Sequence, residues 1–216
     1  MKKMVKSFVF VVVACALMAT NALAFTVVEG GDITEINAPH EWAKAEIELA
    51  REAGLLTEHT DNYFKEDITR FQFAELAVNL AEKATGKEIT AAPVDIFTDC
   101  TETAVLKAYA AGIVNGVGDG AFAPDQTTNR EQIAAMLYRA VQYIEQNGGK
   151  GLDVKSTDIS KYTDNAQVSS WAKDAVGVLA ANGVMKGTSE TMLSPQASCT
   201  VEQSVLLVYR LYVLTK

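Results

Sequence analysis

A pattern of helix caps followed by apolar residues recurs three times and most constrains how this chain can fold. Thr69, Asn129 and Thr200 each precede a Gln by three residues, which is the spacing of a capping box at a helix N-terminus. The apolar residues behind the central cap follow the spacing of one helix face: Ile133, Met136, Leu137, Ala140, Val141 and Ile144. The same offsets recur at 73–84, and at 204–215 with polar ends and an apolar centre.

A shorter helical pattern precedes each capped helix and ends at a glycine. Gly54, Gly112 and Gly183 suit the left-handed position after a helix, and the next residue (Leu55, Ile113 or Val184) is the apolar residue that usually packs back there. The sequence therefore predicts an all-α fold of three repeats, at 39–90, 91–150 and 151–216, after a lead-in at 25–38. A pair of helices of about 50 residues buries too little apolar surface to be stable alone, so the three repeats must share a core.

The first 24 residues have the features of a secretory signal peptide. Lys2, Lys3 and Lys6 precede an apolar stretch, and Ala22-Leu23-Ala24 is a small-x-small cleavage site. An alternative lipoprotein box ends at Cys15 but leaves an apolar region of only about six residues. Thr20-Asn21 interrupts the apolar run too early for it to span a membrane, and we expect no spanning segment elsewhere.

Charge and cysteine content exclude several functions. Removing the three lysines of the signal peptide from a chain of net charge −8 leaves the mature chain at −11, which disfavours nucleic acid. Cys100 and Cys199 lie in no zinc or redox motif, and the sequence leaves open whether they form a disulfide or remain two packed thiols. The glycine-rich segment 116–120 lacks both the Lys of a phosphate loop and the ligands of a calcium loop. We expect neither a metal nor a cofactor.

Catalytic residues are scarce. His40 and His59 are the two histidines, and neither lies in a metal or triad pattern. The acids of the first helix, Glu41, Glu46, Glu48 and Glu52, have the spacing of a solvated face. We therefore predict that the protein is not an enzyme.

Several short motifs recur in register with the repeat. Trp42-Ala43 and Trp171-Ala172 open the first helices, and Arg70 and Arg130 follow the caps of second helices. Asn115-Gly116 precedes Ala-Phe-Ala-Pro-Asp, and an aromatic-x-Asp triplet leads into the second and third repeats. In these features the chain resembles the S-layer homology domain. It departs from that pattern at Cys100, where Trp is typical, at Val201, where Arg is typical, and at Thr57-Glu58, which replaces the Asn-Gly turn.

The resemblance implies three repeats closed around a pseudo-threefold axis, an exported location at the cell wall or cell surface, and non-covalent binding of an acidic wall polysaccharide. The ligand-binding residues that it implies are Arg130, Arg70, Asn115, Gly116, Trp42 and Trp171. Each also has a purely structural interpretation: solvated arginines, turn residues and packing tryptophans. The alternative function is an exported scaffold that binds another envelope protein or peptidoglycan.

Overall fold

The computed structural model describes residues 37–153 and 155–216, so the signal peptide, the alternative lipoprotein box and most of the lead-in lie outside the described residues. Over the described ranges the fold is all-α, as predicted, with no strand and only isolated β-bridges. In the same ranges, no helix is long and apolar enough to cross a membrane. The elements are α2 (Glu41–Glu52), α3 (Arg70–Thr85), α4 (Thr103–Ala110), α5 (Arg130–Gln146), η1 (Asn165–Gln167), η2 (Ser170–Ala172), α6 (Lys173–Ala181) and α7 (Val201–Thr215).

The predicted helix ends are confirmed. Thr69, Asn129 and Thr200 each form a complete capping box, with the side chain of the following Gln bonded back to the N–H of the cap. The three glycine stops have φ angles of 66°, 68° and 70°, in the left-handed region that side chains with a Cβ rarely adopt. The apolar residue after each glycine is fully buried. The local signals therefore fix where these helices begin and end.

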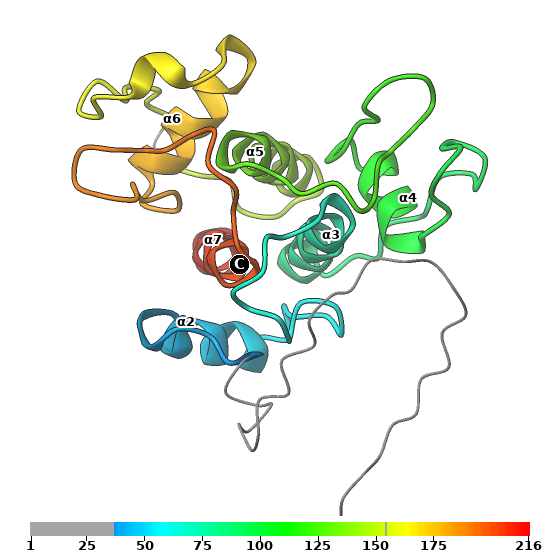
Figure 1. Ribbon diagram of the computed structural model, residues 1–216. Coiled ribbons are helices and arrows are strands. Elements are labelled where there is room, and N and C mark those ends of the chain that lie inside the picture. Colours follow the sequence, from blue (N-terminus) through cyan, green and yellow to red (C-terminus); the bar gives the residue numbers. More distant parts are fainter. Residues whose placement is uncertain (1–36, 154) are drawn as a thin grey trace, which may run out of the picture. The chain divides into compact units, whose positions relative to one another are not determined.

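The helices pair in a cyclic order. The second helices of the repeats, α3, α5 and α7, contact one another in the centre, where Figure 1 shows them end-on. Each first helix packs against the second helix of the preceding repeat: α4 on α3, α6 on α5, and α2 back on α7. Because every repeat completes the helix pair of another, the three repeats share one hydrophobic core.

Backbone contacts join consecutive repeats in the same way at all three junctions. The N–H groups of Arg70, Arg130 and Val201, at the start of α3, α5 and α7, donate to carbonyls in the loop of the next repeat in the cycle. Isolated antiparallel bridges lie beside these contacts, at Thr69–Thr127, Asn129–Ser198 and Asp67–Thr200. The N-terminal N–H groups of a helix have no partner within it, so the neighbouring loop satisfies them.

The core contains the predicted apolar faces. Phe73, Leu76, Leu80, Ile133, Leu137 and Ile144 are fully buried. The polar ends of the α7 face are also buried, and Ser204 and Thr215 donate to carbonyls one turn back in the helix. Cys100 and Cys199 are buried free thiols, so of the two interpretations left open by the sequence, the structure has two packed thiols and no disulfide.

Candidate functional site

Arg70 and Arg130 are buried at the junctions between repeats, which corrects their interpretation as solvated surface residues. They expose 9% and 6% of their surface. Arg70 donates from Nε to Phe122 O (2.8 Å) and from Nη2 to Asn115 O (2.9 Å). Arg130 donates in the same way to Leu193 O (2.9 Å) and Lys186 O (2.6 Å). Burial lowers the pKa of both guanidinium groups. Each arginine therefore fastens the loop of the next repeat.

Two aspartates hold the same loops from their N–H side. The carboxylate of Asp99 accepts from Phe122 N (2.7 Å) and Ala123 N (2.8 Å). That of Asp164 accepts from Leu193 N (2.9 Å) and Ser194 N (2.7 Å). The backbone N–H groups of Phe122 and Ala123 lower the pKa of Asp99. At Asp164, burial acts to raise the pKa, but the N–H groups of Leu193 and Ser194 outweigh it, so the pKa is lowered there too. This is the role of the aromatic-x-Asp motif, which the sequence alone did not reveal.

Two grooves open beside the buried arginines. The first, which we call the Trp171 groove, has a volume of about 230 Å³ and brings together four of the six predicted residues: Arg70, Asn115, Gly116 and Trp171. The second, the Trp42 groove, has a volume of about 360 Å³ and contains the other two, Arg130 and Trp42, with Lys186-Gly187 in place of Asn115-Gly116. Residues from all three repeats line each groove, so neither groove exists within a single repeat.

The two tryptophans lie on the surface rather than in the core. Trp42 and Trp171 each expose 57% of their surface. The start of each Trp-bearing helix is held by a buried glutamate: Glu131 accepts from Ser169 N (2.9 Å) and Oγ (2.8 Å), and Glu202 accepts from His40 N (2.9 Å) and Nδ1 (2.7 Å). These contacts position an aromatic ring at the edge of each groove without burying it.

The glycine beside each groove is required by the turn. A Cβ on Gly116 would lie 2.7 Å from Ala121 O, and one on Gly187 would lie 2.4 Å from Ser189 O. These distances are shorter than real Cβ contacts, so the closed turn itself demands glycine. Asn115 is exposed, and its carbonyl is the acceptor that holds Arg70.

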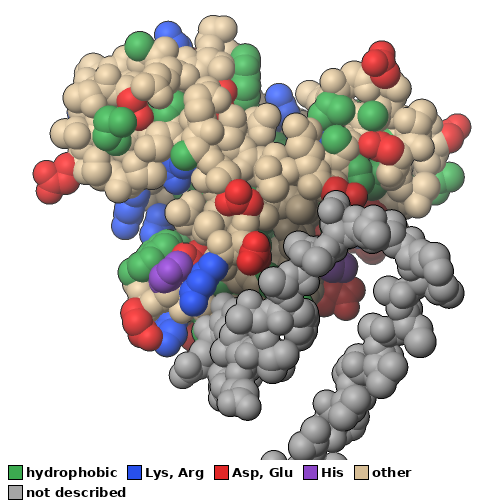
Figure 2. All heavy atoms as spheres, viewed as in Figure 1, with side chains coloured by type: hydrophobic (Ala, Val, Ile, Leu, Met, Phe, Trp, Pro, Cys, Tyr) green, Lys and Arg blue, Asp and Glu red, His purple; other side chains and the backbone are tan. Residues whose placement is uncertain are grey.

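Sequence reasoning missed a second arginine in each groove. Arg139 on α5 lines the Trp171 groove and Arg210 on α7 lines the Trp42 groove. Each stands ten residues after its cap, and Asn79 occupies that offset in the first repeat. This repeated offset is the signal that would have identified them. Figure 2 shows Lys and Arg side chains gathered between the loop that follows α6 and helix α2. Two of the basic residues that line the Trp42 groove are Lys186, in the loop after α6, and Arg210, on α7.

The third junction has the opposite charge. Its hollow has a volume of about 550 Å³ and is lined by one lysine, Lys107, by His59 and by four glutamates: Glu58, Glu75, Glu82 and Glu102. Val201 replaces the buried arginine of the other two junctions, and Asn79 replaces their second arginine. Cys100, which is buried, stands at the position of the exposed tryptophan. We call this hollow the acidic groove.

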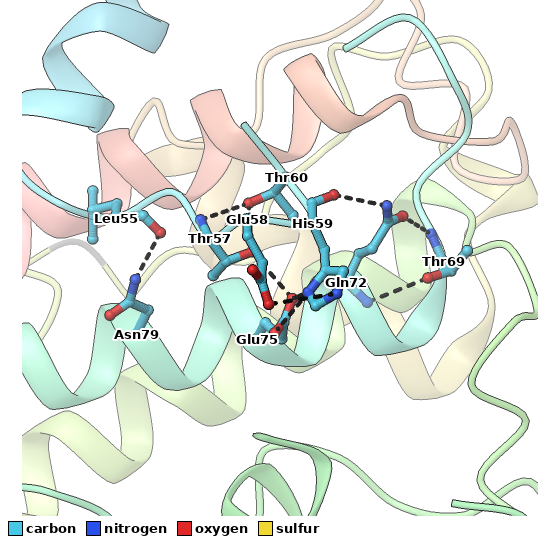
Figure 3. A network of polar contacts seen from close by, with 9 residues as sticks. All are labelled: Leu55, Thr57, Glu58, His59, Thr60, Thr69, Gln72, Glu75 and Asn79. Carbon is cyan, nitrogen blue, oxygen red and sulfur yellow. Dashed lines mark hydrogen bonds and ion pairs between the residues drawn. The ribbon is translucent and has the colours of Figure 1, made fainter. Parts of the chain in front are cut away.

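Contacts within the first repeat brace the loop of the acidic groove (Figure 3). The Thr60 hydroxyl accepts from Thr57 N (2.9 Å) and lies 3.0 Å from Thr57 Oγ1, which in turn donates to Glu75 Oε2 (3.1 Å). His59 Nδ1 lies 3.0 Å from the same carboxylate oxygen. Burial raises the pKa of Glu75. Threonine contacts within the loop thus stabilise it at the junction that has Val201. At the other two junctions, a buried arginine holds the corresponding loop.

Comparison with known proteins matches two of the three repeats to a family. A model described as the S-layer homology domain matches residues 98–134 and 161–200. The Surface-layer 125 kDa protein of Lysinibacillus sphaericus is 25% identical over 211 residues, covering 93% of this chain and 16% of the relative. A Cellulosome-anchoring protein of Acetivibrio thermocellus is 31% identical over 102 residues, covering 45% and 20%. An Endoglucanase of Bacillus sp. (strain KSM-635) is 34% identical over 104 residues, covering 48% and 10%. The matches span at most a fifth of the length of these relatives.

Proposed function

Because this chain belongs to the S-layer homology family, whose domains are cell-wall-binding modules, we propose that it attaches to an acidic cell-wall polysaccharide through the Trp171 and Trp42 grooves. The family and its surface-layer relatives assign the chain to the cell surface or cell wall. The observation that carries the proposal is the paired composition of the two grooves. Each combines an exposed tryptophan with two arginines, and none of the described residues that line either groove is acidic.

The residues in these grooves suit a sugar that bears a carboxylate. A tryptophan ring presents a large apolar face on which the C–H face of a pyranose can stack. Arginine binds carboxylates through charge-assisted hydrogen bonds. The Nε and Nη2 atoms of Arg70 and Arg130 already donate to loop carbonyls, whereas Nη1 makes no hydrogen bond within the described residues. That nitrogen remains available to a ligand.

The net negative charge of the protein does not prevent this binding. Screening limits the repulsion between exposed charges to roughly 8 Å at physiological salt, so the lining of a groove decides what enters it. Two arginines favour an anion in the Trp171 groove, and three basic residues do so in the Trp42 groove. Four glutamates in the acidic groove repel an anion. The chain therefore offers two sites for an acidic polymer rather than three.

We further infer that the protein acts without catalysis. Glycoside hydrolysis requires a positioned pair of carboxyl groups, and over residues 37–153 and 155–216 no carboxylate lines either tryptophan groove. The name of the endoglucanase relative describes a protein of which this chain matches 10% of the length. The alternative function, capture of another envelope protein or of bare peptidoglycan, is favoured by the loss of motif residues at Val201 and Thr57-Glu58.

Purified wall sacculi, with and without their secondary polymers, distinguish these functions. We expect the protein to sediment with intact sacculi and to lose binding when the polymers are stripped. Trp42→Ala and Trp171→Ala should each weaken binding by roughly fivefold, because stacking on an aromatic ring contributes about 1 kcal/mol. The double variant should lose most of the binding. Tyr63→Asn is the matched control, because Tyr63 exposes 55% of its surface, lines neither groove, and has a left-handed φ of 50° that Asn tolerates.

Two outcomes would contradict the proposal. Equal binding to stripped sacculi would favour peptidoglycan as the ligand. Unchanged binding of the double tryptophan variant would show that the grooves are not the site and would favour a protein partner.

A further inference from the structure

The second arginines of the two grooves differ in what they already bind. Arg210, in the Trp42 groove, donates from Nε to Glu46 Oε2 (2.7 Å) and from Nη2 to Glu46 Oε1 (2.8 Å). The pair is only partly exposed, with 21% of the Arg210 side chain and 30% of the Glu46 side chain accessible. Arg139, in the Trp171 groove, makes one long contact from Nη1 to Ile113 O (3.4 Å) and no ion pair with any described residue.

One substitution between the repeats explains this difference. Glu46 lies four residues after Trp42, and four residues after Trp171 the chain has Ala175. Glu46 lies on α2, which also carries Trp42 and packs against α7; Ala175 lies on α6, which follows the short helix η2 of Trp171 and packs against α5. A carboxylate therefore pairs with Arg210, whereas the equivalent position on α6, the helix that packs against the helix of Arg139, has the buried methyl group of Ala175.

We propose that Glu46 acts as an internal competitor for the anionic ligand, so that the Trp171 groove is the stronger carboxylate site and the Trp42 groove the weaker one. This inference rests on the proposed function. A ligand carboxylate can occupy the side-on edge of Arg210 only by displacing a carboxylate that already fills it. Displacement would also leave Glu46 partly buried without its partner, which is costly. In the Trp171 groove, Arg139 has no acidic partner among the described residues that would have to move.

Lys186 does not remove this asymmetry. It lines the Trp42 groove at the position that Asn115 occupies in the other, and it adds one exposed positive charge. An ammonium on a long flexible stem is a strongly hydrated point charge, and exposed ion pairs of this kind contribute little. We expect the Lys186 ammonium to attract the polymer as a whole. It does not replace the planar, two-point contact that a free arginine makes with a carboxylate.

The two tryptophans allow each groove to be followed separately. The chain contains two Trp residues, one in each groove, so the two indole N–H signals in an NMR titration report the two sites. The probe is the methyl glycoside of an N-acetylhexosamine carrying a 4,6-pyruvate ketal. Its 4,6-isopropylidene analogue has the same ring system without the carboxylate. With the mature parent protein, the Trp171 signal should reach half-saturation at about tenfold lower concentration of the acidic probe than the Trp42 signal, because one charge-assisted contact differs. The neutral analogue should not distinguish the grooves.

Reciprocal variants test the assigned cause. Glu46→Ala and Glu46→Gln should each tighten binding at Trp42 by about tenfold and leave the Trp171 titration unchanged. Ala175→Glu should weaken binding at Trp171 alone. Ala175 is 4% exposed, so this variant requires a folding check, and the two Glu46 variants decide the question if it fails. Lys186→Asn is the control for charge alone and should change binding at Trp42 by less than about threefold.

The failures are distinguishable. If both signals of the parent titrate together and the Glu46 variants leave Trp42 unchanged, the competitor role of Glu46 is refuted and the proposed function stands. If neither indole signal responds to the acidic probe, the proposed function fails and the inference falls with it.

Discussion

Replacing Arg130 by alanine should destabilise the protein before it reveals anything about binding. The change removes the donors to Leu193 O and Lys186 O, which lie 2.9 Å and 2.6 Å from the guanidinium. Leaving a buried acceptor without a partner costs about 1–3 kcal/mol. The first of these carbonyls belongs to a buried contact and the second to a partly buried one. We therefore expect the free energy of unfolding to fall by about 3 kcal/mol, out of the roughly 5–15 kcal/mol typical of a domain.

Urea unfolding followed by far-ultraviolet circular dichroism measures this loss. Arg139→Ala is the matched control, because Arg139 lies on the same helix and lines a groove but makes a single 3.4 Å contact. We expect that control to lose less than about 1 kcal/mol. Arg130→Lys should recover part of the stability, since an ammonium can reach one of the two carbonyls but cannot span both as a planar fork does. An Arg130→Ala protein as stable as Arg139→Ala would refute the reasoning.

The third junction, where Val201 stands at the position of Arg130, shows which other changes accompany an apolar residue there. Val201 is accommodated there beside a shorter loop: the segment from Glu58 to Asn62 has five residues, whereas its counterpart from Gly116 to Phe122 has seven. Thr60 is fully buried and braces that shorter loop with its own hydroxyl. Arg130→Ala supplies neither change, so its two carbonyls stay without a donor.

Two further predictions follow from the described contacts. Because the pKa of Asp164 is lowered in the folded state, its contribution to stability is complete above about pH 4 and is lost as the pH falls through the folded value. Between about pH 5 and 2, the unfolding free energy of Asp164→Asn, measured by urea unfolding at each pH, should therefore depend less on pH than that of the parent protein. An identical pH profile of the two proteins would contradict this role. Burial raises the pKa of the Cys100 and Cys199 thiols, so iodoacetamide should modify both only when the protein unfolds. The intact mass after treatment in denaturant should show two alkylated thiols. Protection of both thiols in denaturant would indicate a disulfide instead.

Local signals in the sequence determined where the helices begin and end. A cap and a Gln three residues later interact within one helical turn, as at Asn129 and Gln132, and a left-handed glycine such as Gly112 ends a helix through contacts in its last turn. Apolar periodicity is likewise a property of one helix. These interactions join residues close together in the chain, so the pattern of residues alone predicts them.

The tertiary structure decided which repeats meet and what their side chains face. Arg70 looks like an exposed first-turn residue until the loop that holds Asn115 and Phe122, 45 and 52 residues away, closes over it. The same holds for Arg210, whose partner Glu46 is 164 residues distant and was interpreted from its own helix as part of a solvated face. Burial and charge pairing depend on neighbours in space, and here those neighbours come from other repeats. The sequence by itself therefore determined three similar helical units, and only their cyclic packing decided that two junctions form basic grooves and the third an acidic one.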